Sequence, residues 1–350
     1  MAQAYTEHTL KLPDGIEILY TDSGAPKTTD YTTLVVVHGT GFNGYGFIPL
    51  HEYAHKYNLR IILWNRREYR GSTKYSDEEL ADLKAGRKVF QDRLAIQTAW
   101  FLEHFIKNES SPKVTADRSA GGFILMGWSF GNATTLALFA DPAVIPKPLY
   151  ETVEPHLRSL VLYDPPFLVM DCASLMLADG VQDPFNNHAV TTDEAHDIFR
   201  KFISSYFKSN ILAGRLSYET LADKQPTIHR WTKEEIDKYC DSASAINLDF
   251  LASMPPMAEI LRSQAHHALF DETVVASHFP DVNVFYITGE ETACYCIWAY
   301  TESSRMYREA LERGARPRPT KFKLVPEGNH FLHYDVPEQF LRDITEGCAK

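Results

Sequence analysis

One serine of this chain has neighbours that suit nucleophilic catalysis. The segment GWSFG, residues 127–131, lies between an apolar run that begins at residue 122 and the small, helix-forming residues that follow. Glycines two residues before and two residues after Ser129 remove side chains that would collide in a tight strand-to-helix turn. The serine hydroxyl can then point out of the strand end as a nucleophile. The alternative is a tight turn in which the serine only caps the helix.

A serine needs a base that takes its proton, and the chain offers a histidine near its end. His330 stands in PEGNHFLHYDVPEQF, residues 326–340, directly after the last predicted strand. A loop in that place lies at the carboxyl end of a parallel sheet, which is also the end that carries Ser129. We predict His330 as the base, with His333 as the competing candidate.

Two backbone amides are candidates for an oxyanion hole, which stabilises the negative oxygen formed during acyl transfer. The amide of Phe130 follows the serine at the start of a predicted helix, where partial positive charge gathers. The segment HGTG, residues 38–41, closes another apolar run, and we predict Thr40 as the second donor, with Gly41 as the alternative. His38 is interpreted as a residue that fixes this loop. We predict four residues that contact the substrate: Gly39, Gly41, Phe42 and Trp128.

The elements that would position these residues are buried strands that alternate with helices. Continuous apolar runs are typical of strands covered on both faces, as in a parallel sheet. Two alternating segments near the start, HTLKL and IEILYTD, predict an antiparallel hairpin at the edge of that sheet. The pattern predicts an α/β domain with right-handed crossovers. The apolar runs span residues 33–39, 60–66, 122–129, 157–164, 282–289 and 321–328.

Helix signals fall between these runs and dominate one long segment. Ser76 and Glu79 form a capping-box pattern that opens a long amphipathic stretch to about residue 104. Between two predicted strands, helix patterns such as 193–209 and 231–240 replace any convincing buried strand. We therefore predict a core of residues 1–165 and 274–350 and a helical cap of residues 166–273. Aromatic and methionine side chains of the cap would pack it, and some of them would line an apolar pocket.

Four motifs in this order resemble the α/β-hydrolase family over nearly the whole chain. They are HGTG (38–41), REYRGST (67–73, with Glu68 in an acidic position), GWSFG (127–131) and NHFLHYDVPEQF (329–340). The resemblance implies a mostly parallel central sheet, a cap inserted after the sixth strand, a Ser-His-acid triad and no cofactor. The last motif also favours His330 over His333. The segments WNRREYRGST and LYDPPF are similar to a branch common in fungi, which includes secondary-metabolism hydrolases and lactone-forming cyclases.

The acid of the expected triad departs from the family pattern. In most members it follows the strand predicted at 282–289, where this chain has Thr292, with Glu290 and Glu291 nearby. The family also allows an acid after the preceding strand, and Asp164 stands there. We predict Asp164 as the acid that orients the histidine. Glu291 or Glu290 is the alternative, in which case Asp164 would only cap the entry to the cap.

Composition and charge exclude several other classes of protein. The formal net charge of −11 and the lack of a basic block argue against a nucleic-acid partner. The start of the chain does not resemble a signal peptide, and no window approaches the roughly 18 apolar residues of a membrane span. An odd number of cysteines then predicts free thiols and a cytoplasmic protein. We expect no metal site, because the pair Cys294 and Cys296 has no second ligand pair at a zinc-like spacing. The oligomeric state stays open.

These observations predict a serine hydrolase that cleaves an ester, thioester or lactone of an apolar small molecule. A serine at position 129 argues against the epoxide and haloalkane branches, which resemble this family but need an aspartate there. Two alternatives stay open. One is a cyclase or acyl transferase of secondary metabolism that closes a lactone ring on the same residues. The other is a receptor that keeps the fold only to bind a ligand.

Overall fold

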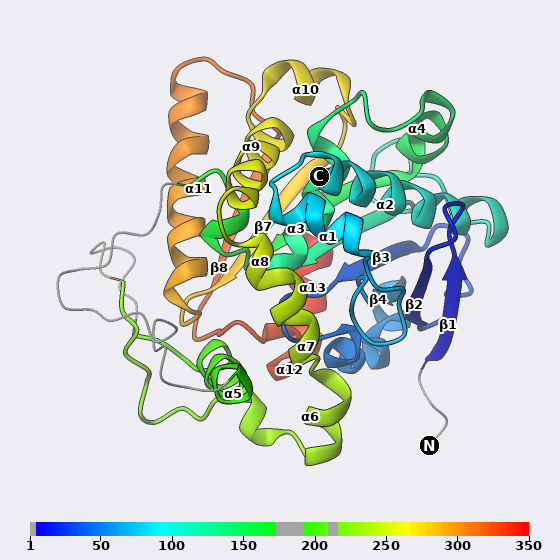
Figure 1. Cartoon of the computed structure of the whole chain (residues 1–350). Helices are drawn as coiled ribbons and strands as arrows, with labels where there is room; N and C mark the ends of the chain where they lie inside the picture. The colour runs from blue at the N-terminus through cyan, green and yellow to red at the C-terminus, as the bar shows by residue number, and fades with distance from the viewer. Residues whose placement is uncertain (1–4, 173–191, 209–215, 350) are drawn as a thin grey trace.

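The structure is a computed structural model that describes residues 5–172, 192–208 and 216–349. Eight strands in this part of the chain form one sheet, in the order β1-β2-β4-β3-β5-β6-β7-β8 (Figure 1). The hairpin β1–β2 is antiparallel, β2 pairs antiparallel with β4, and the other neighbours are parallel, so the predicted α/β class and mostly parallel sheet are confirmed. The strands are β1 (Thr6–Lys11), β2 (Glu17–Asp22), β3 (Thr32–Val37), β4 (Leu59–Trp64), β5 (Phe123–Trp128), β6 (Leu157–Tyr163), β7 (Asn283–Gly289) and β8 (Thr320–Val325).

The apolar runs form strands because helices cover both faces of the sheet. Every residue of β3, β4, β5 and β6 is buried, whereas the edge strand β1 is mostly exposed. One face is covered by α2, α3, α4 and α9. The 3-10 helix η1 (Gly44–Tyr53) and the helices α12 and α13 belong to the second apolar cluster. Figure 1 shows α2, α3 and α9 in front of the sheet. Burial on both faces explains why these strands lack an alternating pattern.

The described helices match several predicted boundaries. The capping box of Ser76 and Glu79 starts α1, and α13 coincides with the closing segment PEQFLRDITEG. The helices are α1 (Asp77–Lys84), α2 (Val89–Asn108), α3 (Asn132–Ala140), α4 (Lys147–Val153), α5 (Thr192–Ile203), α6 (Lys233–Tyr239), α7 (Ser242–Ser244), α8 (Phe250–Ala252), α9 (Met257–Leu269), α10 (Glu272–Ser277), α11 (Cys294–Glu312), α12 (Leu332–Asp335) and α13 (Pro337–Gly347).

The long amphipathic stretch predicted after Ser76 is divided into two helices in the structure. Helix α1 ends at Lys84, and Gly86 adopts a φ of +62°. A left-handed residue of this kind ends a helix, and glycine adopts that conformation with little strain. A Cβ atom at Gly86 would lie 2.7 Å from Cγ of Pro256. The break therefore lets the chain approach the segment before α9.

Helices fill the described part of the insertion between β6 and β7. Helix α5 covers most of the predicted segment 193–209, and the capping box of Thr232 and Glu235 starts α6. Residues 173–191 and 209–215 of the predicted cap lie outside the described residues. Helix α9 falls within the predicted cap of 166–273 but packs on core helix α3, where Gln264 Nε2 donates to the Ala133 carbonyl at 2.7 Å.

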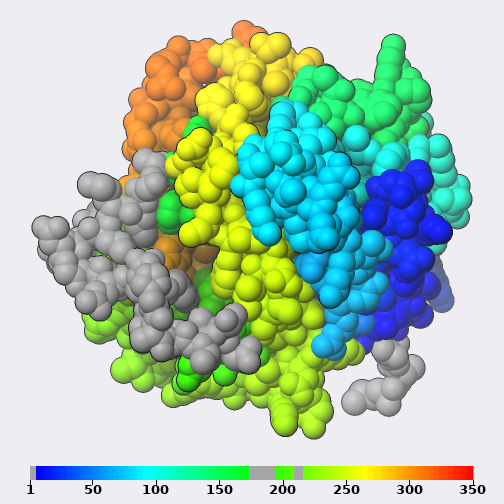
Figure 2. Space-filling view, in the orientation of Figure 1, coloured from blue at the N-terminus to red at the C-terminus, as the bar shows by residue number. Residues whose placement is uncertain are grey.

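The segment around α6 and α7 contacts the glycine-rich loop that follows β3. The Asn43 amide donates to the Tyr239 carbonyl at 2.9 Å, and the Asp241 amide donates to the Gly41 carbonyl at 3.0 Å. Phe42 and Cys240 form an isolated antiparallel bridge between these two bonds. In Figure 2 the yellow-green surface of the insertion runs alongside the blue and cyan surface of residues that follow β4. This part of the insertion therefore lies at the carboxyl edge of the sheet.

Candidate active site

Ser129 and Asp164 leave two adjacent strands at the same edge. Their predecessors, Trp128 in β5 and Tyr163 in β6, are paired residues of the parallel ladder. Ser129 has a φ of 53° and Asp164 a φ of 49°, both in the left-handed region that non-glycine residues rarely adopt. Such strained residues persist only where the surroundings hold them, and they are common at functional sites. The predicted sharp turn at Ser129 is present.

Glycines allow other backbone segments to approach this turn closely. A Cβ atom at Gly39 would lie 2.6 Å from Cβ of Ser129 and 3.2 Å from its Oγ. A Cβ atom at Gly131 would lie 2.2 Å from the Val37 carbonyl oxygen. The 2.6 Å and 2.2 Å distances are too short for any side chain at these positions. The two glycines therefore let the end of β3 and the loop after it pack directly on the serine turn. Ser129 itself is 9 % exposed.

His330 and Asp164 form a buried hydrogen-bonded pair. The Nδ1 atom of His330 bonds to Oδ2 of Asp164, and both side chains are buried. Because a carboxylate only accepts hydrogen bonds, Nδ1 carries the proton and Nε2 of the neutral ring has the lone pair. Within the described ranges, this Nε2 is buried and has no hydrogen-bond partner. It is available to take a proton from another group.

Thr292, which stands where the family usually places the acid, bonds to the predicted acid Asp164. Its Oγ1 donates to Oδ2 of Asp164 at 2.5 Å, and the Asp164 amide donates to the Ile287 carbonyl at 2.9 Å. The alternative carboxylate of Glu291 accepts from Nζ of Lys224 at 2.6 Å. The hydrogen bond between Thr292 and Asp164 was not predicted from the sequence. The feature that could have indicated it is a residue with a hydroxyl group at the position where most family members have the acid.

A thiol completes a group of three side chains with metal-ligating atoms. Sγ of Cys296 lies 3.8 Å from Nδ1 of His330, and the ligand atoms of Asp164, Cys296 and His330 lie within 4.8 Å of one another. Burial raises the pKa of Cys296 well above its ordinary value, and the Asp164 charge adds to this rise. A cysteine binds zinc as a thiolate, and in this structure the histidine and the carboxylate already bind each other. The group therefore suits a His-carboxylate pair beside a neutral thiol better than a metal site.

His333, the competing base, lies in a different environment. Its ring stacks on Phe47 with centroids 3.7 Å apart, and its Nδ1 lies 3.0 Å from Oη of Tyr163. Burial lowers the pKa of His333 well below its ordinary value, and the proximity of His330, which becomes positive when it takes a proton, lowers it further. His333 therefore packs in the core behind the site.

Two predicted substrate contacts, Phe42 and Trp128, lie within an aromatic cluster. Trp128 is 1 % exposed, and its Nε1 donates to the His330 carbonyl at 2.9 Å. Phe42 is 2 % exposed and packs against Trp128, Trp231 and Phe331. In this structure both side chains are covered, and Trp128 fixes the loop that carries His330. Their role in substrate contact stays a prediction.

The loop after β3 fixes its own conformation through His38. Its Nε2 accepts from the Arg66 amide at 3.0 Å, and its Nδ1 donates to the Gly39 carbonyl at 2.9 Å. Burial lowers the pKa of His38 well below its ordinary value, and the charge of Arg66 adds to this effect. Both ring nitrogens are used within the fold, which agrees with the interpretation of His38 as a residue that fixes the loop.

The amides of this region differ in their partners. Gly41 donates its N–H to Oη of Tyr69 at 2.9 Å, so this alternative donor is already occupied. Phe130 is the second residue of the 3-10 helix η3 (Ser129–Gly131), where an amide has no partner inside the helix. Thr40 lies between Gly39 and Gly41 on the loop that contacts the serine. The amides of Phe130 and Thr40 therefore remain the candidate donors of an oxyanion hole.

The match to a protein-family model gives the family of this fold and site. Residues 34–343 match the model of the Alpha/beta hydrolase family, and the chain belongs to that family. A search of curated protein sequences found no match. None of the helices in the described ranges combines the length and the apolar character that crossing a membrane requires.

Solved structures of several hydrolases share the fold. The haloalkane dehalogenase DatA from Agrobacterium tumefaciens C58 is 12 % identical with a TM-score of 0.57, over 99 % of this chain and 96 % of that one. An esterase from Exiguobacterium antarcticum is 12 % identical with a TM-score of 0.52, over 99 % and 100 % of the two chains. The epoxide hydrolase VrEH1 from Vigna radiata is 11 % identical with a TM-score of 0.51, over 99 % and 98 %. At these identities the likeness is one of fold.

Proposed function

We propose that this chain is a serine hydrolase that cleaves an ester, thioester or lactone of an apolar small molecule through an acyl-enzyme. The observation that carries the proposal is the buried bond between His330 and Asp164, which leaves Nε2 of the histidine unpaired. Ser129 supports it, because the residue stands in a strained turn at the end of the strand next to Asp164. These groups match a nucleophile, a base and an orienting acid.

In the proposed reaction Oγ of Ser129 attacks the carbonyl carbon of the substrate while Nε2 of His330 takes the hydroxyl proton. The tetrahedral intermediate collapses, and the leaving alcohol or thiol receives that proton from His330. Water then attacks the acyl-enzyme with His330 again as the base, and the acid product and free Ser129 are formed. Asp164 keeps the ring in the required tautomer and stabilises its charged form.

The negative oxygen of the intermediate would bind the amides of Phe130 and Thr40. Phe130 lies at the start of the helical segment η3–α3, where the peptide dipoles place partial positive charge. Thr40 belongs to the loop whose Gly39 approaches Ser129. Fixed amides in a buried site stabilise charge without having to reorganise during the reaction.

The side chain at position 129 favours esterase-like chemistry over that of other relatives. The structurally similar proteins include an esterase, an epoxide hydrolase and a haloalkane dehalogenase. The epoxide and haloalkane branches need a carboxylate nucleophile, and this chain has a serine at the turn. A serine forms an acyl-enzyme with a carbonyl substrate, so the ester, thioester or lactone class fits best.

Burial of the site supports ring closure as a second candidate reaction. Ser129, Asp164 and His330 are all less than 10 % exposed, and the segment around α6 and α7 lies against the adjacent loop. We propose that these helices act as the cap of the site. If the cap excludes water, a hydroxyl of the acyl group itself can attack the acyl-enzyme and form a lactone.

A fluorophosphonate probe tests the proposed nucleophile. Wild-type protein should gain the mass of one phosphonyl group on Ser129, whereas Ser129→Ala should not be labelled and should lose at least about 10³-fold in ester turnover. Ser159→Ala, which removes a hydroxyl from buried strand β6, is the matched control and should be labelled like wild type. If wild type is not labelled, the chain is a binding protein, and the hydrolase proposal is wrong.

Turnover in oxygen-18 water separates the two reactions. Hydrolysis places one heavy oxygen in the acid product, because water attacks the acyl-enzyme. Ring closure gives a lactone without the heavy isotope. A substrate with a hydroxyl four or five atoms from its carbonyl permits both outcomes in one assay. Incorporation in the large majority of product supports the hydrolase, and its absence supports the cyclase.

A further inference from the structure

We infer that Asp249, a residue of the insertion, is a positioning residue for the oxyanion hole. The inference rests on the proposed function, because it concerns the loop that would supply the Thr40 amide. Asp249 ends the π-helix η7 (Ala245–Asp249), and its side chain is 1 % exposed. Short π-helical turns are frequent at functional sites. Within the described part of the chain, the hydrogen-bond partners of this carboxylate lie on the core.

The first partner is the guanidinium of Arg66, which contacts both the insertion and the glycine loop. Nη1 donates to Oδ1 of Asp249 at 3.0 Å, and Nη2 donates to Oδ2 at 2.6 Å. The same Nη2 donates to the Gly39 carbonyl at 3.0 Å. Burial lowers the pKa of Arg66, but Asp249 together with the nearby tyrosines Tyr69 and Tyr75 raises it by more, so the net pKa lies above its ordinary value and the group stays charged. The ion pair therefore holds the Gly39 carbonyl in place.

Fixing the Gly39 carbonyl also fixes the orientation of the Thr40 N–H, the proposed oxyanion donor. The carbonyl of Gly39 and the N–H of Thr40 belong to one peptide group, which is planar and places the two bonds in opposite directions when trans. Arg66 and Nδ1 of His38 both bond to the Gly39 oxygen. Any rotation of this peptide plane would break these two hydrogen bonds and turn the Thr40 N–H away from the proposed oxyanion position.

The second partner is the phenol of Tyr69, which fixes the next peptide group. Its hydroxyl donates to Oδ2 of Asp249 at 2.5 Å and accepts from the Gly41 amide at 2.9 Å. Burial raises the pKa of Tyr69 well above its ordinary value, and Asp249 raises it further, so the phenol keeps its proton. One carboxylate thus controls the peptide groups on both sides of Thr40.

This arrangement couples the insertion to the proposed chemistry. Asp249 lies on the insertion, whereas Arg66, Tyr69 and the glycine loop lie on the core. Ser244 adds a second link, because its Oγ donates to the Glu68 carbonyl at 2.7 Å. The oxyanion hole is complete only while η7 is seated on the core. If the insertion were displaced, Ser129 would remain, but the Thr40 amide would no longer be held in the orientation that binds the oxyanion.

The test compares Asp249→Asn and Arg66→Lys with the wild type, using p-nitrophenyl butyrate as substrate and butylboronic acid as a tetrahedral mimic. Asp249→Asn should lower kcat about 10- to 100-fold and weaken boronic acid binding by a similar factor, since the amide is misaimed rather than removed. KM should change less than about threefold, because the hole acts in the transition state. Arg66→Lys keeps the charge opposite Asp249 but cannot make the same forked contacts, and about a 10-fold loss in kcat is expected.

The control is Asp22→Asn, which breaks the buried pair with Arg60 near the amino end of β4. It should lower the melting temperature and leave kcat within about threefold of wild type. The inference is overturned if the folded Asp249→Asn protein keeps kcat and boronic acid affinity within about threefold. If Asp249→Asn does not fold, the inference is overturned when Arg66→Lys keeps kcat and boronic acid affinity within about threefold of wild type. Failure of the hydrolase proposal looks different, because wild type would then show no labelling and no Ser129-dependent turnover.

Discussion

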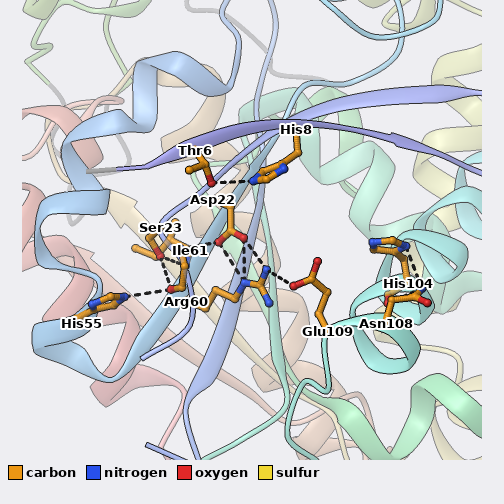
Figure 3. A network of polar contacts seen from close by, with 11 residues as sticks. Thr6, His8, Asp22, Ser23, His55, Arg60, Ile61, His104, Asn108 and Glu109 are labelled. Atoms are coloured by element: carbon orange, nitrogen blue, oxygen red, sulfur yellow. Dashed lines mark hydrogen bonds and ion pairs between the residues drawn. The ribbon is translucent and has the colours of Figure 1, made fainter. Parts of the chain in front are cut away.

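Two buried arginines lie near the two ends of strand β4, and they have different partners. Arg60 lies near the amino end of β4 and pairs with Asp22, at the end of neighbouring strand β2. Glu109, which follows α2, is its second carboxylate at 3.0 Å (Figure 3). Arg66 lies two residues beyond the carboxyl end and pairs with Asp249 of the insertion. Both arginines are buried and opposed by carboxylates.

The difference lies in what else each arginine holds. Among the described residues, the side chain of Arg60 bonds to the carboxylates of Asp22 and Glu109, which ties neighbouring core elements together. Arg66 bonds to Asp249 and also to the backbone of the loop beside Ser129. We propose that the pair at the amino end contributes to stability, while the pair at the carboxyl end sets the geometry of the site. Substitutions at the two ends should therefore separate activity from stability.

The largest loss at the carboxyl edge is expected for the base. His330→Ala should reduce kcat about 10³-fold or more and abolish fluorophosphonate labelling, because Ser129 would lose its proton acceptor. His333→Ala is the matched control from the same segment, and it should keep most labelling while losing stability through its buried ring. Labelling lost in His333→Ala and kept in His330→Ala would exchange the two roles.

The acid should give the next largest effect. Asp164→Asn keeps the shape but favours the wrong histidine tautomer, so kcat should fall on the order of 10²- to 10⁴-fold. Glu291→Gln, which removes the alternative carboxylate, should cost less than about threefold, since that group pairs with Lys224. Steady-state kinetics on both variants decide the point. A larger loss for Glu291→Gln would move the acid to the later strand.

Candidate site residues in local patterns can be proposed from the sequence, whereas pairs of residues that only the fold brings together cannot. Ser129 stands in a five-residue turn motif, and His330 stands in a segment after the last strand, so both carry local signals. The pair of Arg66 and Asp249 joins residues 183 positions apart. Nothing in the sequence near Asp249 indicates which surface its short helix contacts. Such pairs follow from tertiary packing.

The fold shows the same limit in two places. Apolar runs predicted the strands within a few residues, since burial on both faces leaves a continuous signal. The break at Gly86 was missed because amphipathic periodicity continues on both sides of it. Trp128 was predicted to contact substrate, and in the structure its ring lies in an aromatic cluster with Phe47 and Phe331. The sequence next to Ser129 does not indicate this packing, because it depends on residues far along the chain.

A smaller effect at the carboxyl edge is expected for Thr292. Thr292→Val removes the hydroxyl that donates to Asp164 and keeps the side-chain shape. Asp164 stays in place but loses one hydrogen-bond donor, so a loss of about 10-fold in kcat is expected, which corresponds to about 1.4 kcal/mol. Thr288→Val is the matched control, because the Thr288 hydroxyl is buried in β7 without a hydrogen-bond partner among the described residues. Equal kinetics for the two variants would show that the Thr292 bond is unimportant for the acid.

The smallest effect on activity is expected at the amino end of β4. Asp22→Asn leaves the buried Arg60 with Glu109 as its remaining carboxylate, and Glu109 is only partly buried. Removing one partner of a buried ion pair is strongly destabilising, and with Glu109 left in place we expect a loss of about 2–3 kcal/mol in the free energy of unfolding. Urea denaturation measures this loss, and kcat on the folded protein should stay within about threefold of wild type. A loss of stability without a loss of kcat here, beside a loss of kcat in Asp249→Asn, would separate the two ends as proposed. If Asp22→Asn lowers kcat as much as Asp249→Asn does, a disturbance at the amino end of β4 also changes the geometry around Ser129. The proposed separation of the two ends would then be wrong.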